Sequence, residues 1–159
     1  MSTVIAITNQ KGGVGKTTTA CALLAGLHQR GARVLGVDLD PQGSLGFCLG
    51  LDIENCATVY DVMKGTCPIR QVVTQSDCGD ILPSNILLSA AELEFSRPGR
   101  EFLLKNQLAE VADEYDFIVI DTPPALNVLT VNAYVAADGL VIPMAPEILS
   151  LLGVSQIRE

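Results

Sequence analysis

A glycine-rich segment that contains two lysines, Lys11-Gly-Gly-Val-Gly-Lys-Thr17, restricts the possible folds of this chain more than any other feature. An apolar run over 3–8 precedes it, and apolar residues at helical spacing follow it over 17–30. Closely spaced glycines let the backbone wrap so that successive N–H groups point at one anion, and the helix start adds its positive dipole end. Lys16 can then reach the β- and γ-phosphates of a nucleotide, while the Thr17 hydroxyl can ligate Mg²⁺. The strand–loop–helix context disfavours the alternative of a turn that binds nothing, so a phosphate-binding loop is predicted.

Short apolar runs alternate with segments of helical periodicity along the rest of the chain. This alternation predicts an α/β fold with a mostly parallel sheet, helices on both faces, and a single domain over 1–159. A loop containing Pro and Gly is expected over 41–50, and Ser89 with Glu92 is expected to form a capping box at the start of a short helix. We expect strands over 3–8, 33–39, 80–83, 117–120 and 139–143, and helices over 17–30, 58–64, 68–73, 90–95, 100–114, 127–137 and from 147 onward.

Composition excludes several classes of protein. Hydrophobic residues make up 48% of the 159 residues and charged residues 18%, which is enough apolar side chain to bury a core. No apolar run approaches the length of a membrane span and the N-terminus lacks a secretory signal, so a cytoplasmic protein without a membrane partner is expected. The five cysteines are odd in number and form no CxxC pair, which argues against a disulfide framework or a structural zinc site.

Acidic residues follow two of the predicted strands at their carboxyl ends, where ligands bind in open α/β sheets. Asp38 and Asp40 close the strand over 33–39, and alternation places both side chains on the same face. Asp121 closes the strand over 117–120. Carboxylates in such places can hold Mg²⁺ directly or through its waters. The alternative for each of the three is a structural role as a loop cap.

The glycine-rich loop departs from the ordinary P-loop pattern in two ways that point to one family. Gln10 stands where the ordinary pattern has Gly, and Lys11 adds a second lysine inside the loop. The segment KGGVGKTTT resembles the deviant Walker A motif of the ParA/MinD ATPases, which are P-loop NTPases. Val37-Asp-Leu-Asp-Pro-Gln-Gly43 resembles their switch I motif, and Ile118-Val-Ile-Asp-Thr-Pro-Pro124 resembles their Walker B strand and switch II. The segments TVYDVMKG and ILPSNILLSAAELEF resemble the ParA/Soj branch, and the likeness extends from residue 1 to about residue 153.

This resemblance implies an ATPase that uses ATP and Mg²⁺. It assigns catalytic roles to Lys16, to Asp40 through the attacking water, and to Lys11, which in the family crosses a dimer interface to the ATP of the partner subunit. It places Mg²⁺ near Thr17, Asp38 and Asp121. The residues expected to bind the nucleotide are Lys11, Gly12, Gly13, Val14, Gly15, Lys16, Thr17 and Thr18.

The resemblance also implies partners and a cellular role. A ParA-type protein partitions plasmid or chromosome DNA as an ATP-dependent homodimer, binds nonspecific DNA on the nucleoid, and responds to a ParB-type activating partner. Family members extend further, so the chain resembles a C-terminally truncated member whose fold is incomplete relative to the family. Ten Lys and Arg residues against 18 Asp and Glu give a net charge of −8, so this chain itself is expected to bind DNA poorly.

Three other functions remain open from the sequence. A MinD-like positioning ATPase would need an amphipathic membrane helix, which the sequence does not show. An electron-transfer protein similar to the nitrogenase iron protein would need paired cysteines at a subunit interface, and none lies near the switch II motif. A remnant that binds nucleotide without turnover would be separated from an ATPase by comparing ATP affinity with ATP hydrolysis.

Overall fold

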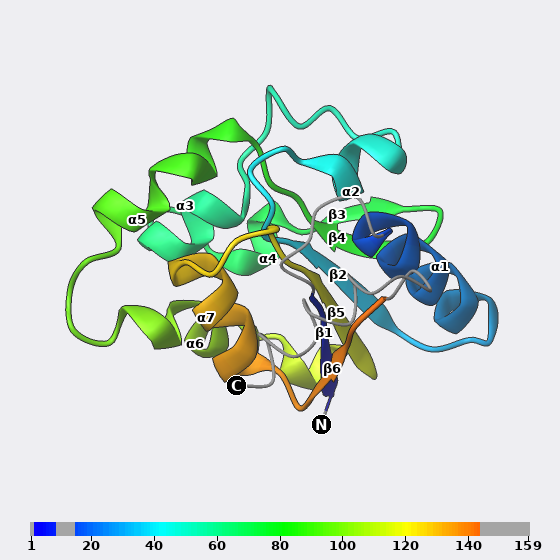
Figure 1. Ribbon diagram of the computed structural model, residues 1–159. Helices are drawn as coiled ribbons and strands as arrows, with labels where there is room; N and C mark the ends of the chain where they lie inside the picture. The colour runs from blue at the N-terminus through cyan, green and yellow to red at the C-terminus, as the bar shows by residue number, and fades with distance from the viewer. Residues whose placement is uncertain (1, 9–14, 144–159) are drawn as a thin grey trace.

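A six-stranded sheet forms the centre of the molecule in the computed structural model, which describes residues 2–8 and 15–143 (Figure 1). The strand order is β3-β4-β2-β5-β1-β6, and every pair is parallel except β3 with β4. The prediction of a mostly parallel sheet is therefore confirmed. The strands are β1 (Thr3–Ile7), β2 (Val34–Asp38), β3 (Thr74–Ser76), β4 (Gly79–Leu82), β5 (Phe117–Asp121) and β6 (Gly139–Val141).

Helices cover both faces of the sheet. Helices α1 and α2 pack on one face, and α3 to α7 lie on the other (Figure 1). Because both faces are covered, the central strands are nearly continuous runs of buried apolar residues. The helices are α1 (Lys16–Gln29), α2 (Ser44–Cys48), α3 (Val59–Lys64), α4 (Ile69–Val72), α5 (Ala91–Glu94), α6 (Leu103–Ala109) and α7 (Val128–Ala136), with 3-10 turns η1 (Ile86–Ala90), η2 (Arg100–Phe102) and η3 (Ala112–Glu114).

Close packing of α1 on the sheet depends on Gly36 in the middle of β2. A Cβ atom at this position would lie 2.7 Å from a methyl group of Leu24 and 2.8 Å from one of Ile81. Both side chains are fully buried, so neither has room to move aside. The absence of a side chain at Gly36 therefore sets how near the phosphate-loop helix approaches the strand.

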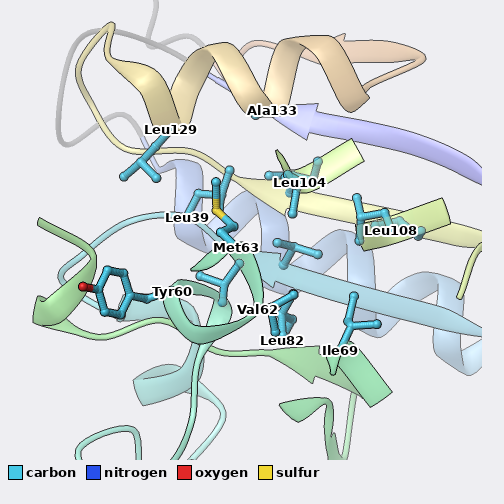
Figure 2. Close-up of a cluster of buried hydrophobic side chains, with 14 of the residues drawn as sticks. Leu39, Tyr60, Val62, Met63, Ile69, Leu82, Leu104, Leu108, Leu129 and Ala133 are labelled. Atoms are coloured by element: carbon cyan, nitrogen blue, oxygen red, sulfur yellow. The ribbon is translucent and has the colours of Figure 1, made fainter. Parts of the chain in front are cut away.

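The larger part of the core lies on the opposite face, between the sheet and α3 to α7. Figure 2 shows Met63 of α3 and Leu104 of α6 extending toward Leu39 and Leu82 at the sheet. Tyr60 lies at the margin of this cluster, with its hydroxyl directed away from the other labelled side chains (Figure 2). Every one of these residues is less than a tenth exposed. The core includes Leu39, directly after β2, and Leu129, in the helix that follows β5, so it holds both segments in place.

Several predicted elements differ from the observed ones. The loop predicted over 41–50 contains the short helix α2, and strand β3 was not predicted. The capping box predicted for Ser89 and Glu92 is wrong, because Asn85 caps the preceding 3-10 turn and the Ser89 hydroxyl donates to the Ile86 carbonyl. The helix predicted from 147 onward lies outside the described residues.

The single helix predicted over 100–114 is divided into η2, α6 and η3, and Asn132 of α7 explains the first break. Its Oδ1 accepts the Leu104 N–H at 3.1 Å, and its Nδ2 donates to the Arg100 carbonyl at 3.0 Å. In a continuous helix these two backbone groups would bond to each other. The buried amide of Asn132 therefore replaces one helical hydrogen bond and ties the start of α6 to α7.

We expect Asn132→Ala to lower the free energy of unfolding by about 2–4 kcal/mol, because it leaves buried backbone groups without partners. Asn132 is fully buried and also donates to the Val128 carbonyl. Urea denaturation followed by circular dichroism measures the change. Asn55→Ala is the control, since Asn55 makes only exposed bonds to Asp52. If Asn132→Ala lowered the free energy of unfolding no more than Asn55→Ala, the stabilising role of the Asn132 hydrogen bonds would be contradicted.

Candidate nucleotide-binding site

Residues from the phosphate loop and from the predicted Walker B strand meet at the carboxyl edge of the sheet. The Thr17 hydroxyl, in the first turn of α1, donates to Oδ2 of Asp121 at 2.8 Å. Asp38 and Asp121 end the neighbouring strands β2 and β5 at the same register position. Lys16 lies beside them at the start of α1 and is 8% exposed. The structure therefore brings together Lys16, Thr17, Asp38 and Asp121, four of the residues that the sequence predicted for this edge.

Asp121 carries the clearest signature of a ligand-binding group. It is 1% exposed, and within the part of the chain that the structure describes its Oδ1 is buried without a hydrogen-bond partner. Burial raises the pKa of this carboxyl to about 6, against the opposing effect of the Thr17 hydrogen bond. Buried acceptors without partners are rare in folded proteins. A hard cation or its water would satisfy this oxygen, so Asp121 and Thr17 fit the expected Mg²⁺ site.

Asp38 uses its carboxylate oxygens to hold the chain that follows β2. Oδ1 accepts the Asp40 N–H at 3.0 Å, and Oδ2 accepts the Leu45 N–H at 3.2 Å. The side chain is fully buried, and burial together with the charge of Asp121 raises its pKa well above the ordinary value. These contacts are those of a loop cap. The predicted place of Asp38 near Mg²⁺ remains a prediction.

Asp40 is half-buried at the start of the loop after β2. Its Oδ1 accepts the Gln42 N–H at 3.0 Å, and its carbonyl accepts the Ser84 hydroxyl at 2.8 Å. Gly43 closes this turn with φ of 67°, and a Cβ there would lie 2.9 Å from the Ser84 carbonyl oxygen. A side chain at Gly43 would thus be strained in both conformation and space. The loop holds Asp40 at the same edge of the sheet as Asp121.

The phosphate loop itself is described only at its end. Gly15 adopts a left-handed conformation with φ of 78°, directly before α1. Thr18 is exposed in the first turn of α1, whereas Lys16 is buried. Lys11, Gly12, Gly13 and Val14 lie outside the described residues, so their predicted roles stay predictions.

The sequence did not single out two tethers around this site. The hydroxyls of Thr8, directly after β1, and Tyr134 of α7 form a hydrogen bond of 2.7 Å. The Thr122 hydroxyl donates to the Ile7 carbonyl at 2.7 Å, so it joins the exit of β5 to β1. In the sequence, both threonines directly follow a buried strand, and a polar residue in that position could have indicated such a hydrogen bond. Nothing local in the sequence pairs Tyr134 with Thr8, which is 126 residues away.

The sheet order and the Thr17–Asp121 pair at the start of α1 are those of the P-loop NTPase fold. Comparison with known proteins gives the family. The sequence model of the family described as "AAA domain" matches residues 2–159, and the chain belongs to this family. Its relatives include proteins named Soj and ParA, in agreement with the resemblance that the motifs predicted.

Two curated relatives illustrate this membership. The sporulation initiation inhibitor protein Soj of Bacillus subtilis is 45% identical over 99% of this chain and 64% of its own length. The chromosome partitioning protein ParA of Myxococcus xanthus is 42% identical over 98% of this chain and 56% of its own length. The chain thus spans less than two thirds of both proteins.

One solved structure shows the same fold with ligands bound. It is the crystal structure of cobyrinic acid a,c-diamide synthase from Mycobacterium smegmatis with bound ATP analogue and magnesium. It is 42% identical, with a TM-score of 0.95, over 99% of this chain and 66% of that chain. The P-loop NTPase fold is therefore confirmed. Nucleotide and Mg²⁺ binding are properties of the structural neighbours.

Among the described residues, no helix is long and apolar enough to cross a membrane. Within the same residues, no group of three or more His, Cys, Asp or Glu side chains is arranged to hold a metal ion. Of the three residues expected near Mg²⁺, Thr17 and Asp121 are joined by a hydrogen bond, whereas the Asp38 carboxylate accepts two backbone N–H groups.

Proposed function

We propose that this chain binds Mg-ATP and hydrolyses ATP as a ParA-like DNA-partitioning switch. One observation carries the proposal: among the described residues, the buried Oδ1 of Asp121 has no hydrogen-bond partner, and it lies beside the Thr17 hydroxyl at the start of the phosphate-loop helix. Such an arrangement suits a cation that itself holds phosphate oxygens. Mg²⁺ bound there would neutralise charge on the β- and γ-phosphates.

The residues at the site have distinct proposed roles. Lys16 neutralises phosphate charge, and its burial strengthens that attraction. Thr17 and Asp121 hold Mg²⁺, while Asp40 orients the attacking water. Lys11 contributes a second cation to the ATP of a partner subunit, which fits the extra charge that a triphosphate between two subunits requires.

The contacts around Asp38 support a role for the loops as a nucleotide-dependent switch. Asp38 fixes the loop after β2 through two backbone N–H groups, and the Leu39 N–H donates to the Asp121 carbonyl at 2.8 Å. The segment after β2 is therefore joined to the last residue of β5, which also accepts the Thr17 hydroxyl at the start of α1. A loop held by few bonds can change arrangement when a γ-phosphate is lost.

Partners follow from family membership as further proposals. ATP binding closes a homodimer, a ParB-type protein stimulates hydrolysis, and the complete protein acts in the cytoplasm on nucleoid DNA. Mg-ATP-dependent light scattering would measure dimer formation.

The synthase name of one structural neighbour suggests a second activity, ATP-dependent amide formation. Amide synthesis requires a carboxylate acceptor and a nitrogen donor, whereas a switch releases phosphate from ATP and water alone. Phosphate release without an added acceptor therefore separates the two activities.

We expect Asp40→Asn to lower acceptor-free ATP hydrolysis by about 10²–10⁴-fold, because the amide no longer attracts a proton from the water. Mg-ATP affinity should be retained, since Lys16, Thr17 and Asp121 are unchanged. A coupled phosphate assay gives the rate, and calorimetry gives the affinity. Asp52→Asn is the matched control, because Asp52 is an exposed carboxylate outside the site. If Asp40→Asn hydrolysed ATP as fast as the control, the proposed role of Asp40 would be wrong. If the unaltered chain did not hydrolyse ATP, the proposed ATPase activity would be wrong.

A further inference from the structure

A pocket of about 390 Å³ lies between α3, α5 and η2, and none of the residues proposed to bind ATP or Mg²⁺ lines it. Its walls combine apolar side chains with three cationic ones. Among the described side chains, one carboxylate lines it, that of Glu94. The lining residues are Met63, Lys64, Glu94, Phe95, Arg97, Pro98, Gly99, Arg100 and Leu103.

The cations make this a local positive surface on an acidic chain with a net charge of −8. Arg97 and Arg100 are exposed, and in the described part of the chain neither guanidinium forms an ion pair. Lys64 comes from α3, more than thirty residues earlier in the sequence. The fold therefore concentrates cations that are dispersed along the chain, and this surface attracts a negatively charged partner.

The ammonium group of Lys64 is held in place beside the pocket. It lies 4.8 Å from the centre of the Tyr60 ring and 4.0 Å from Oε2 of Glu94. The Tyr60 hydroxyl donates to Oε1 of the same Glu94 at 2.5 Å. These contacts restrict the rotamers of Lys64 before any ligand arrives, which lowers the entropic cost of binding there.

The apolar side chains that line the pocket favour a negatively charged partner that also carries apolar groups. Met63 and Phe95 are buried in the pocket wall, and Leu103 is half-buried beside them. On the elements that border the pocket, Leu93 is 87% exposed and Phe102 is 44% exposed. A DNA backbone offers phosphates but no apolar group for such a hollow. A peptide that carries both carboxylates and apolar side chains matches both features.

We propose that this pocket binds an acidic segment of a partner protein, with an apolar side chain of the segment inserted between Phe95 and Leu103. Its carboxylates pair with Arg97 and Arg100, while Lys64 stays beside Glu94 at the margin of the pocket. This interaction does not depend on the proposed ATPase activity.

Asn132 connects the proposed surface to the nucleotide-binding side of the molecule. It bonds to the Arg100 carbonyl and the Leu104 N–H, at the edge of the pocket, and it belongs to α7. Helix α7 begins shortly after Asp121 and bonds to Thr8 through Tyr134. Helix α7 is therefore hydrogen-bonded both to the edge of the pocket and to the residue that follows β1.

The test uses fluorescence anisotropy with the 159-residue chain and a labelled peptide in which Asp and Glu alternate with Leu and Phe. We expect saturable binding that weakens as salt is added, because exposed charges are screened. A peptide with Ser in place of Leu and Phe, and one with Lys in place of Asp and Glu, should each bind more weakly. Chemical-shift mapping of the amides should place the largest changes at Phe95, Arg100 and Leu104.

The double variant Arg97→Glu/Arg100→Glu should lose about tenfold or more in affinity for the acidic peptide. Arg30→Glu/Lys105→Glu is its matched control, with the same change of net charge at two exposed cations outside the pocket. Equal affinity of the two double variants would overturn the proposal. Equal binding of the Lys-containing peptide, or tighter binding of a short DNA duplex than of the acidic peptide, would also overturn it.

Discussion

Replacing Asp121 with Asn is expected to stabilise the ligand-free protein at neutral pH. Asp121 is buried, and that burial raises its pKa from an ordinary 3.8 to about 6. Between these values the folded state binds a proton that the unfolded state has released, so stability falls as the pH rises from about 4 to about 6. Above about pH 6 the buried carboxylate of Asp121 is charged, and this charge lowers the free energy of unfolding by about 3 kcal/mol. The neutral amide avoids this cost and can still accept the Thr17 hydroxyl.

Thermal unfolding at several pH values measures this effect. Asp121→Asn should unfold roughly 5–10 °C higher than the unaltered chain at pH 7, and the difference should vanish near pH 4. Asp116→Asn is the control with the opposite sign, because Arg33 lowers the pKa of that exposed carboxyl. Burial raises the pKa of Asp38 as well. The unfolding temperatures of the unaltered chain and of Asp121→Asn therefore both keep some pH dependence in the same direction. Parallel unfolding curves for Asp121→Asn and the unaltered chain at all pH values would contradict the assignment.

The same variant should lose the stabilisation that Mg-ATP confers, because the amide cannot replace a charged ligand of Mg²⁺. A single substitution would then raise the unfolding temperature without ligand and abolish its rise with ligand. A residue with a purely structural role would not produce this pair of opposite effects. The comparison therefore separates a binding site from a buried core carboxylate.

The meeting of Thr17 with Asp121 could be predicted from the sequence because strand topology fixes it. Parallel strands place their carboxyl ends at one edge, and the loop after β1 opens onto the same edge. Apolar runs identified β1, β2 and β5, and each of these strands ends beside a polar residue. Local patterns were therefore sufficient for the centre of the sheet and for the residues that follow it.

Contacts between distant side chains account for what the sequence did not predict. The sequence over 100–114 has helical periodicity, yet the Asn132 side chain forms hydrogen bonds with the carbonyl of Arg100 and the N–H of Leu104 and interrupts the helix. Likewise, Arg97 and Arg100 lie among glutamates in the sequence, and only the packing of α3 brings Lys64 to them. Neither result follows from periodicity, because both depend on how α3, α6 and α7 pack together.

Lys16→Ala is expected to abolish measurable Mg-ATP binding. Lys16 is 8% exposed at the start of α1, and its charge opposes the rise in the pKa of Asp121. Hydrogen bonds from a charged donor are worth about 1.5–3 kcal/mol each, so losing two to the phosphates weakens affinity by about 10²–10⁴-fold. Calorimetry with Mg-ATP measures the affinity, and Lys105→Ala, which removes an exposed lysine outside the site, is the control. Far-UV circular dichroism verifies that both variants fold. Because Lys16 is buried against the carboxylate edge of the sheet, unchanged affinity in Lys16→Ala would mean that the triphosphate does not bind at the start of α1.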